Sequence, residues 1–338
     1  MKIIIDAMGG DNAPLEIVKG ALEARRDFGV EIVLTGDQSA IEDALRACGG
    51  APAEGIAIRH CTQVIEMCDD PAFACRRKKD ASMTVGLQML RDGEGDAFIS
   101  AGSTGALLSG ATLLVKRVRG IRRAAMAPVI PTATGKAVLI DCGANAECSV
   151  EYLMQFAYLG SFYASRVLGL EKPRVGLLNI GAEDTKGDQL RRDTYAALKK
   201  AGDEGSLNFI GNIEAKEAIK GGCDVIVADG FSGNVMLKTI EGVGSFLGRE
   251  LKGMFLKSLK TKVAALLVKD GLGAFKDRLN PDTIGGTPFL GLTKPVIKAH
   301  GSSGALAIEN AVAQAAAAAE GNISADIEAH IDLMKIDR

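Results

Sequence analysis

Short runs of apolar residues alternate along the chain with longer amphipathic stretches. The short runs have the length and composition of buried strands, and the longer stretches repeat their apolar residues at helical spacing. Strands are predicted over residues 2–5, 31–35, 56–59, 96–100, 136–140, 174–180, 207–210 and 224–228. Helices are predicted over residues 15–28, 84–91, 106–117, 151–168 and 189–200, with another beginning near residue 303. This order indicates an α/β fold of three layers, with helices on both faces of a mostly parallel sheet. No linker or internal repeat interrupts it, so residues 1–338 are predicted to form one domain.

Five of the predicted strands run directly into polar, glycine-rich loops. These loops cover residues 6–14, 100–105, 141–145, 179–187 and 229–234. Open parallel sheets bind ligands at the carboxyl ends of their strands. We therefore expect the five loops to converge on a single cleft at one edge of the sheet.

The composition of these loops suits a bound phosphate. Glycine allows a close approach of the backbone, and a helix N-terminus directs N–H groups and a positive dipole end at an anion. The predicted substrate- and phosphate-binding residues are Asp6, Gly9, Gly10, Ser103, Thr104, Gly105, Asn145, Asn179, Asp229 and Gly230. The alternative for each loop is an ordinary N-cap and tight turn. Neither the G-K-[ST] ending of a P-loop nor a dinucleotide G-x-G-x-x-G is present.

Three further side chains are candidates for catalysis: Lys186, Asn234 and His300. A single lysine is usually a solvated charge and a single histidine is often structural, so position in a strand-end loop is what favours Lys186 and His300. No G-x-S-x-G elbow occurs, and no cysteine adjoins a suitable histidine. Because a phosphate dianion is itself nucleophilic, such a cleft needs only to hold it, position a carbonyl and stabilise an oxyanion.

Residues 245–276 break the strand–helix pattern and are predicted to form a basic amphipathic helical hairpin. Between Arg249 and Asp270 there are six Lys or Arg and two acidic residues, whereas the whole chain has a net charge of −2. Apolar residues are interleaved with these charges. Such a pair of helices suits an anionic bilayer surface, or equally packs against the body or a partner subunit.

The remaining composition excludes several classes of protein. Aromatic residues make up 4% with no Trp, and the net charge is slightly negative, which argues against nucleic-acid binding. The seven scattered cysteines argue against a disulfide framework and fit a reducing cytosol. The sequence shows no signal peptide and no apolar run of about 18 residues. We expect a cytoplasmic protein.

The order and wording of the loops resemble those of the phosphate acyltransferases of fatty acid and phospholipid synthesis. The resemblance runs from Ile5-Asp6-Ala7-Met8-Gly9-Gly10-Asp11 to Ala299-His300-Gly301-Ser302-Ser303, and between them includes Arg76-Arg77-Lys78-Lys79, residues 100–107 and residues 229–241. It implies a fold like that of phosphotransacetylases and isocitrate-type dehydrogenases, assembled as a homodimer. It also implies acyl carrier protein as acyl donor, phosphate as acceptor and acyl phosphate as product, with neither metal nor cofactor. The resemblance further implies peripheral membrane association through the hairpin. Ser103 departs from the family, which more often has Asn there.

On this basis we expect phosphate, held by residues 100–105 and Lys186, to attack the acyl thioester directly. Asn234, His300 and backbone N–H groups would stabilise the oxyanion or protonate the leaving thiolate. Residues 76–79 or the basic hairpin would receive the acidic carrier protein. The alternatives are a phosphate acetyl- or butyryltransferase that uses acyl-coenzyme A, and a non-catalytic scaffold for carrier protein or membrane. A dehydrogenase of related fold would need metal-binding aspartates and an arginine cluster for its substrate. The sequence offers no convincing set of either.

Overall fold

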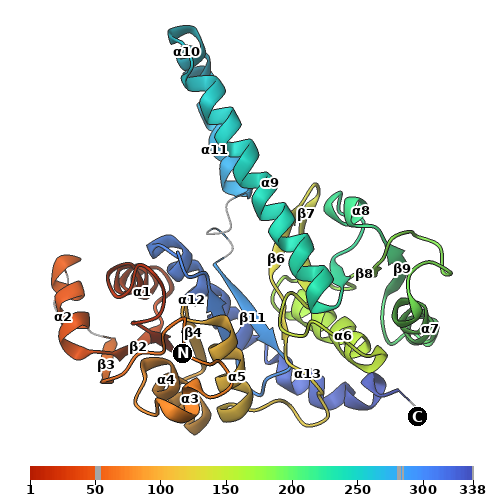
Figure 1. The fold of residues 1–338 in the computed structure, drawn as a ribbon, viewed down its shortest axis with the longest axis horizontal. Coiled ribbons are helices and arrows are strands. Elements are labelled where there is room, and N and C mark those ends of the chain that lie inside the picture. Colours follow the sequence, from red (N-terminus) through yellow and green to blue (C-terminus); the bar gives the residue numbers. More distant parts are fainter. Residues whose placement is uncertain (50–54, 280–282, 284, 337–338) are drawn as a thin grey trace.

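The computed structural model describes residues 1–49, 55–279, 283 and 285–336, and it contains two sheets (Figure 1). The first sheet has the order β3 (Ile56–His60), β2 (Glu31–Gly36), β1 (Lys2–Asp6), β4 (Ala97–Ser100), β12 (Val296–Ala299), β11 (Gly286–Leu290) and β5 (Ala125–Met126). The second has the order β6 (Val129–Thr132), β7 (Gly135–Ile140), β10 (Val225–Val227), β8 (Val175–Leu178) and β9 (Phe209–Ile213). Among the strands that the structure describes, pairing is antiparallel at β12–β11, β11–β5 and β6–β7 and parallel elsewhere. The prediction of an α/β fold with mostly parallel pairing is confirmed.

The prediction of a single sheet is wrong, because the chain builds two sheets and the five loops follow strands of both. All eight predicted strands form, but β5, β6, β11 and β12 were missed. Two of them contain a proline, Pro131 in β6 and Pro288 in β11, and β5 has only two residues, so none gave a clear strand pattern. These short strands complete the first sheet at β5 and begin the second at β6.

Helices cover both faces of each sheet. Successive side chains of a strand point to opposite faces, and the apolar side chains of these strands must be buried on both. Ile3, Ile5 and Ile99 pack under α1 (Leu15–Phe28) and α12 (Ala305–Glu320). Ile4 and Phe98, which point the opposite way, pack under α4 (Ser82–Asp92) and α5 (Thr104–Leu114). The second sheet lies between α6 (Val150–Arg166), α7 (Gln189–Asp203) and α13 (Ile323–His330) on one face and α8 (Ala215–Ile219) and the start of α9 (Gly230–Leu256) on the other. The remaining helices of the body are α2 (Gln38–Ala47), α3 (Ala74–Arg77) and the 3₁₀ helix η2 (Ile331–Met334).

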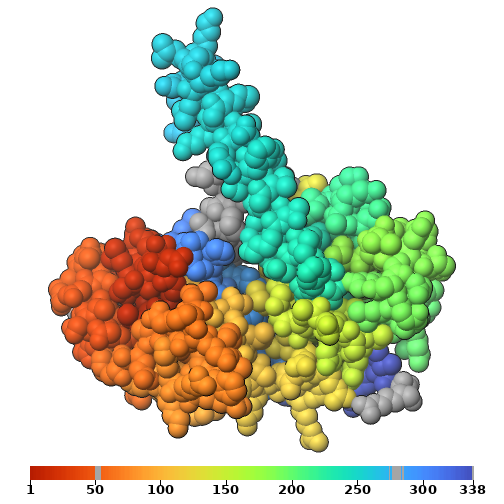
Figure 2. All heavy atoms as spheres, viewed as in Figure 1, coloured from red at the N-terminus to blue at the C-terminus, as the bar shows by residue number. Residues whose placement is uncertain are grey.

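A helical arm stands out from the body where the two sheets meet (Figures 1 and 2). It consists of the outer part of α9, then α10 (Leu259–Leu267) and α11 (Lys269–Leu279). The predicted hairpin of residues 245–276 is therefore helical, but its first helix begins at Gly230, directly after β10. No helix in the described part of the chain is long and apolar enough to cross a bilayer.

Candidate active site

Three adjacent strands of the first sheet, β1, β4 and β12, end beside one another and bring seven of the predicted site residues together. These are Asp6, Gly9, Gly10, Ser103, Thr104, Gly105 and His300. The loops after β1 and β4 touch so closely that a Cβ at Gly9 would lie 2.7 Å from both Asp6 Oδ2 and the Gly102 nitrogen. The Asp11 N–H donates to the Gly301 carbonyl at 2.7 Å, which ties the loop after β1 to the loop after β12. Glycine at position 9 is thus required by space.

Asp6 lies buried at the centre of this group. Its Oδ2 accepts the Ser100 hydroxyl at 2.6 Å, and its Oδ1 accepts the Met8 N–H at 3.2 Å. Burial raises the pKa of Asp6, although the Ser100 and Ser82 hydroxyls, the Met8 N–H and the charge of Lys298 act in the opposite direction. His300, by contrast, is exposed, and its Nδ1 lies 2.8 Å from Ser302 Oγ.

Backbone donors at these strand ends lack protein acceptors. Ser103 caps α5 by accepting the Ala106 N–H at 3.5 Å. Within the described residues, the N–H groups of Gly9, Ser103, Thr104 and Gly105 have no hydrogen-bond acceptor. The α5 N-terminus carries no acidic residue in its first turn. Unpaired donors at a helix N-terminus that lacks a carboxylate are suited to an anion.

The other six predicted residues, Lys186, Asn234, Asn145, Asn179, Asp229 and Gly230, lie at the ends of the second sheet's strands β7, β8 and β10. Here the Asp141 carboxylate organises the loop after β7. It accepts the N–H groups of Cys142 (2.7 Å), Ala144 (3.3 Å) and Asn145 (2.6 Å), the Asn145 amide (3.1 Å), and Met126 N–H (2.8 Å) from β5 of the first sheet. Asp141 therefore joins the two sheets beside the site. Asn145 completes the joint by donating to the Ala124 carbonyl at 2.9 Å.

The first turn of α9 rests on this loop. A Cβ at Gly230 would lie 2.5 Å from the Asn145 carbonyl oxygen, and one at Gly233 would lie 2.0 Å from the Asp141 carbonyl oxygen. Asn234 stands over Gly143, whose Cβ would lie 3.5 Å from Asn234 Oδ1. The polar loop and the base of the arm form one packed unit.

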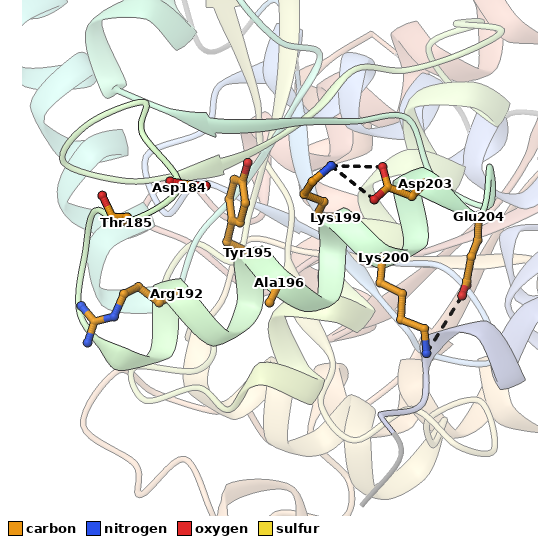
Figure 3. Close-up of a pocket in the computed structure, with 9 residues that line it drawn as sticks. All are labelled: Asp184, Thr185, Arg192, Tyr195, Ala196, Lys199, Lys200, Asp203 and Glu204. Atoms are coloured by element: carbon orange, nitrogen blue, oxygen red, sulfur yellow. Dashed lines mark hydrogen bonds and ion pairs between the residues drawn. The ribbon is translucent and has the colours of Figure 1, made fainter.

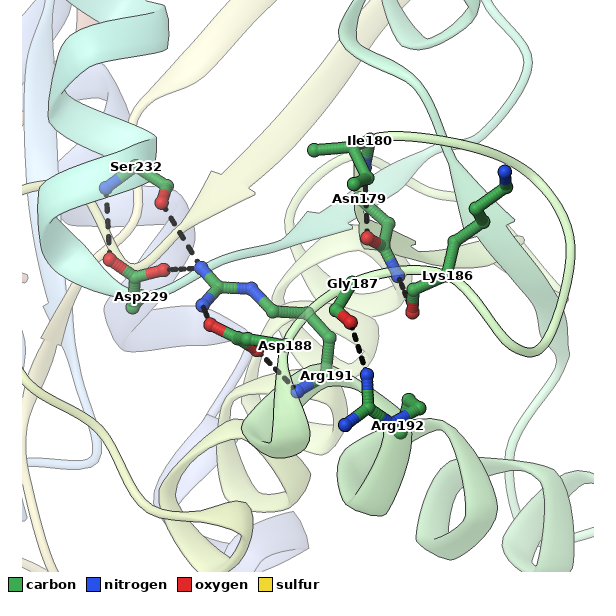
Figure 4. Close-up of polar contacts among 9 residues, drawn as sticks. All are labelled: Asn179, Ile180, Lys186, Gly187, Asp188, Arg191, Arg192, Asp229 and Ser232. Carbon is green, nitrogen blue, oxygen red and sulfur yellow. Dashed lines mark hydrogen bonds and ion pairs between the residues drawn. The ribbon is translucent and has the colours of Figure 1, made fainter.

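Lys186 and Asp229 lie on either side of Arg191, a largely buried arginine that was not among the predicted site residues (Figure 4). Arg191 in α7 bridges Asp188 at 2.7 Å, Ser232 Oγ at 3.1 Å and the Asp229 carboxylate. Asp229 also caps α9 through the Ser232 N–H, so both of its oxygens are occupied. Asn179 holds the loop 179–187 by donating to the Lys186 carbonyl at 3.1 Å. The Lys186 ammonium extends away from this ion cluster and is half exposed.

The expectation that Lys186 and the 100–105 loop form one phosphate site is not met by direct contact. Within the described residues, no hydrogen bond or ion pair joins them, because they belong to different sheets. A cleft of about 430 Å³ lies between α3, α5 and the 141–145 loop. Pro71 on its wall contacts Gly105, and Asn145 lines the other side. Three arginines, Arg76, Arg117 and Arg123, also line this cleft.

A second hollow, of about 700 Å³, runs along the outer side of α7 (Figure 3). Its lysines are paired within the helix, Lys199 with Asp203 at 3.1 Å and Lys200 with Glu204 at 4.0 Å. It shares only Asp184 and Thr185 with the loop after β8. Because the charges that line it are already balanced, this hollow is a poor candidate for a phosphate site.

The whole chain was compared with known proteins. A family model described as fatty acid synthesis protein matches residues 1–326. A phosphate acyltransferase from Alkaliphilus oremlandii is 49% identical over 315 residues, covering 93% of this chain and 92% of the relative. The chain belongs to the phosphate acyltransferase family. Another member, from Thermoanaerobacterium thermosaccharolyticum, is 42% identical over 337 residues and covers 100% of this chain and 98% of the relative. The protein is thus an acyl-transferring enzyme.

Solved structures place this phosphate acyltransferase in the predicted fold. A phosphotransacetylase from Streptococcus pyogenes superposes with a TM-score of 0.65 and 19% identity, covering 94% of each chain. A branched-chain phosphotransacylase from Enterococcus faecalis superposes with a TM-score of 0.54 and 15% identity, covering 94% of this chain and 99% of the other. At such identities the likeness shows the fold alone, and it confirms the phosphotransacetylase-like architecture.

Proposed function

We propose that this phosphate acyltransferase moves a fatty acyl group from acyl carrier protein to inorganic phosphate, and so supplies acyl phosphate for phospholipid synthesis through phosphatidic acid. The observation that carries the proposal is the set of backbone donors without protein acceptors at Gly9, Ser103, Thr104 and Gly105. Phosphate is the family's acceptor substrate, and these N–H groups are suited to its oxygens. His300 and Asn234 remain our candidates for stabilising the oxyanion or protonating the leaving thiolate.

Direct attack by phosphate, without an acyl-enzyme, is favoured by the state of the nearby thiols. Cys142 and Cys148 adjoin the second group of residues, and burial raises the pKa of both, that of Cys148 to about 12. A thiol protonated at neutral pH is a poor nucleophile. Ser100 is fully buried and donates to Asp6, and Ser103 serves as a helix cap. Phosphate then forms the new bond to the carbonyl carbon as the thiolate leaves and takes up a proton.

The acyl donor is proposed to be a carrier protein because of the arginines at the cleft. Of the basic run 76–79, Lys78 is paired with Asp69 at 2.6 Å and Arg77 lies over the Phe73 ring, whereas Arg76 lines the cleft with Arg117 and Arg123. Three guanidinium groups around an opening are complementary to an acidic partner. We propose this rim, rather than the arm, as the landing surface.

The arm is proposed to contact an anionic lipid surface with its tip. Leu259, Leu266 and Leu267 in α10 are 81%, 71% and 82% exposed, and lysines flank them. Such exposed leucines among basic residues suit the interface of a bilayer with anionic lipid. Nearer the body, Val243, Phe246, Leu247 and Met254 form an exposed apolar stripe at helical spacing, which we propose pairs with a second copy in a homodimer.

The deciding experiment supplies purified protein with palmitoyl-acyl-carrier-protein and phosphate and traps acyl phosphate as its hydroxamate. Phosphate-dependent product supports the proposal, and turnover only with short acyl-coenzyme A supports the acetyltransferase alternative. Lys186→Ala and His300→Ala should lower turnover, whereas Lys199→Ala on the far side of α7 should not. Full activity in the first two variants would remove both residues from the mechanism. No product with either donor would favour a scaffold.

Lipid contact and dimerisation are tested separately. Flotation with vesicles containing anionic phosphatidylglycerol should recover the wild type but not a Leu266→Ser, Leu267→Ser variant. Light scattering should report a dimer that Phe246→Ser weakens. Equal flotation of the tip variant, or a monomeric wild type, would contradict the corresponding proposal.

A further inference from the structure

A row of three polar side chains crosses the carboxyl end of the first sheet. Asp6, Ser100 and Lys298 are aligned in register across β1, β4 and β12, one level beyond the paired residues Ile5 and Ile99. Each lies two residues beyond a side chain of the core under α4 and α5, namely Ile4, Phe98 and Val296. Side chains two apart on a strand share a face, so all three point to the α4–α5 side. The sequence analysis singled out Asp6 but missed Lys298.

Lys298 is a buried cation without a carboxylate partner. The residue is 8% exposed, and its Nζ donates to the Ala101 carbonyl at 3.1 Å and to the Ala299 carbonyl. Among the described residues it forms no ion pair, and its third N–H has no acceptor. Burying an ammonium is costly unless an opposite charge accompanies it. The protein itself supplies only the more distant carboxylates of Asp6 and Asp11.

The two carbonyl groups held by Lys298 immediately precede two of the polar loops. Ala101 leads into Gly102–Gly105, whose terminal N–H groups have no acceptor, and Ala299 leads into the 300–304 loop. In that second loop, Ser303 is 1% exposed and its Oγ has no hydrogen-bond partner. The ends of these three neighbouring strands thus share several donors that lack a partner within the described residues. They are one N–H of the Lys298 ammonium, the buried Ser303 hydroxyl and the backbone N–H groups of the 102–105 loop. All are donors, and three of the four oxygens of a phosphate dianion carry no proton and act as acceptors.

We propose that Lys298 is the cation that neutralises the substrate phosphate, donating its third N–H to a phosphate oxygen while it holds the Ala101 and Ala299 carbonyls so that both loops face the anion. The proposal rests on phosphate being the acceptor substrate, and it does not depend on which thioester is the donor. Lys298 is suited to supply charge at the 100–105 loop because its strand β12 pairs with β4, which leads into that loop.

The surroundings of Lys298 also set how its charge responds to pH. Burial lowers the pKa of Lys298 to about 8, while Asp6 and Asp11 act in the opposite direction. Several other elements pack against this end of β12. The neighbouring strands β4 and β11 present Ser100 and Thr287 to Lys298, and α4 presents Ser82. Helix α5 carries no ionisable side chain. His300, two residues along, is exposed and bonded to Ser302. Phosphate is already a dianion above pH 8, so a loss of affinity there reports the lysine.

The test measures binding of inorganic phosphate by calorimetry to the full-length wild type and to Lys298→Met, Lys298→Arg and Lys199→Met. Loss of one charge-assisted contact should weaken phosphate binding by Lys298→Met about 30- to 100-fold, with the same rise in the KM for phosphate and little change in the KM for the acyl donor. Lys298→Arg should recover part of the affinity, and Lys199→Met should match the wild type. Phosphate affinity of Lys298→Met within about threefold of the wild type would overturn the proposal.

A second measurement keeps the proposal testable if Lys298→Met does not fold. Once phosphate is a dianion, its affinity for the wild type should fall about tenfold per pH unit above the pKa of Lys298. A constant affinity between pH 8 and pH 10 would overturn the proposal. Because binding is measured without an acyl donor, inactivity toward acyl-acyl-carrier-protein would contradict the proposed function and leave this inference standing.

Discussion

Replacing Gly233 with alanine should push the first turn of α9 away from the 141–145 loop. A Cβ at this position would lie 2.0 Å from the Asp141 carbonyl oxygen, and contacts under 3.0 Å are essentially never found for real Cβ atoms. The backbone must therefore separate by at least about 1 Å in a close-packed region. Asp141 has little freedom to move, since its N–H donates to the Ala228 carbonyl at 2.9 Å and its side chain holds the loop.

The expected cost can be estimated from these contacts. Overpacking costs about 1 to 3 kcal/mol, and each weakened hydrogen bond adds about 1 kcal/mol. Alanine recovers about 1 kcal/mol of helix propensity relative to glycine. With one hydrogen bond weakened, Gly233→Ala should lower the free energy of unfolding by about 1 to 3 kcal/mol, and it should lower turnover by displacing the loop that holds Asn145.

Gly242→Ala is the matched control, because it makes the same substitution in the same helix. No atom lies within 4 Å of the position that its Cβ would take, so only helix propensity changes, by about 1 kcal/mol in the stabilising direction. Urea unfolding followed by circular dichroism, together with the hydroxamate assay, compares the two variants. Equal stability and activity of Gly233→Ala and Gly242→Ala would refute the packing argument.

Three other predictions concern buried groups. Asp141→Asn should lose at least about 3 kcal/mol of stability, because buried N–H donors lose a charged acceptor. The control Asp203→Asn, on the exposed side of α7, should leave stability unchanged. Equal midpoints of urea unfolding for the two variants would contradict the role of Asp141 in joining the two sheets. In Gly9→Ala the new Cβ would lie 2.7 Å from Asp6 Oδ2. This variant should raise the KM for phosphate at least about tenfold in the hydroxamate assay. An unchanged KM would show that Gly9 is not part of the phosphate site. The pKa of Lys298 is lowered from 10.5 to about 8, so the folded protein binds fewer protons than the unfolded chain between these values, and the free energy of unfolding should rise with pH by on the order of 3 kcal/mol across that window. Unfolding measured at both ends of the window should show this slope in the wild type and less of it in Lys298→Met.

Local pattern was enough to find the elements that carry the site. The continuous run at residues 3–5 and the helical spacing at residues 15–28 were predicted with little error in their bounds. Both signals depend on residues only a few positions apart. The loops that follow the strands were equally visible, because turn glycines and capping residues act on their own neighbourhood.

Long-range pairing could not be predicted in the same way. Pro288 and the two-residue strand β5 gave no strand signal, yet they complete one sheet beside the start of another. That division separates Lys186 from Ser103, which the single-sheet prediction had placed together. The order of strands depends on which surfaces pack best across the whole chain, so it is fixed by contacts far apart in sequence.

The sequence by itself determined an α/β fold, the polar strand ends and, through its resemblance, the family that whole-chain comparison confirmed. Only the tertiary structure decided that Asp141 joins two sheets, that Arg191 bridges two carboxylates and that Lys298 forms no ion pair within the described residues. A lysine near the end of an apolar run reads as surface in a sequence. Its burial, and hence its need for an anion, follows from the strands and helices that pack around it.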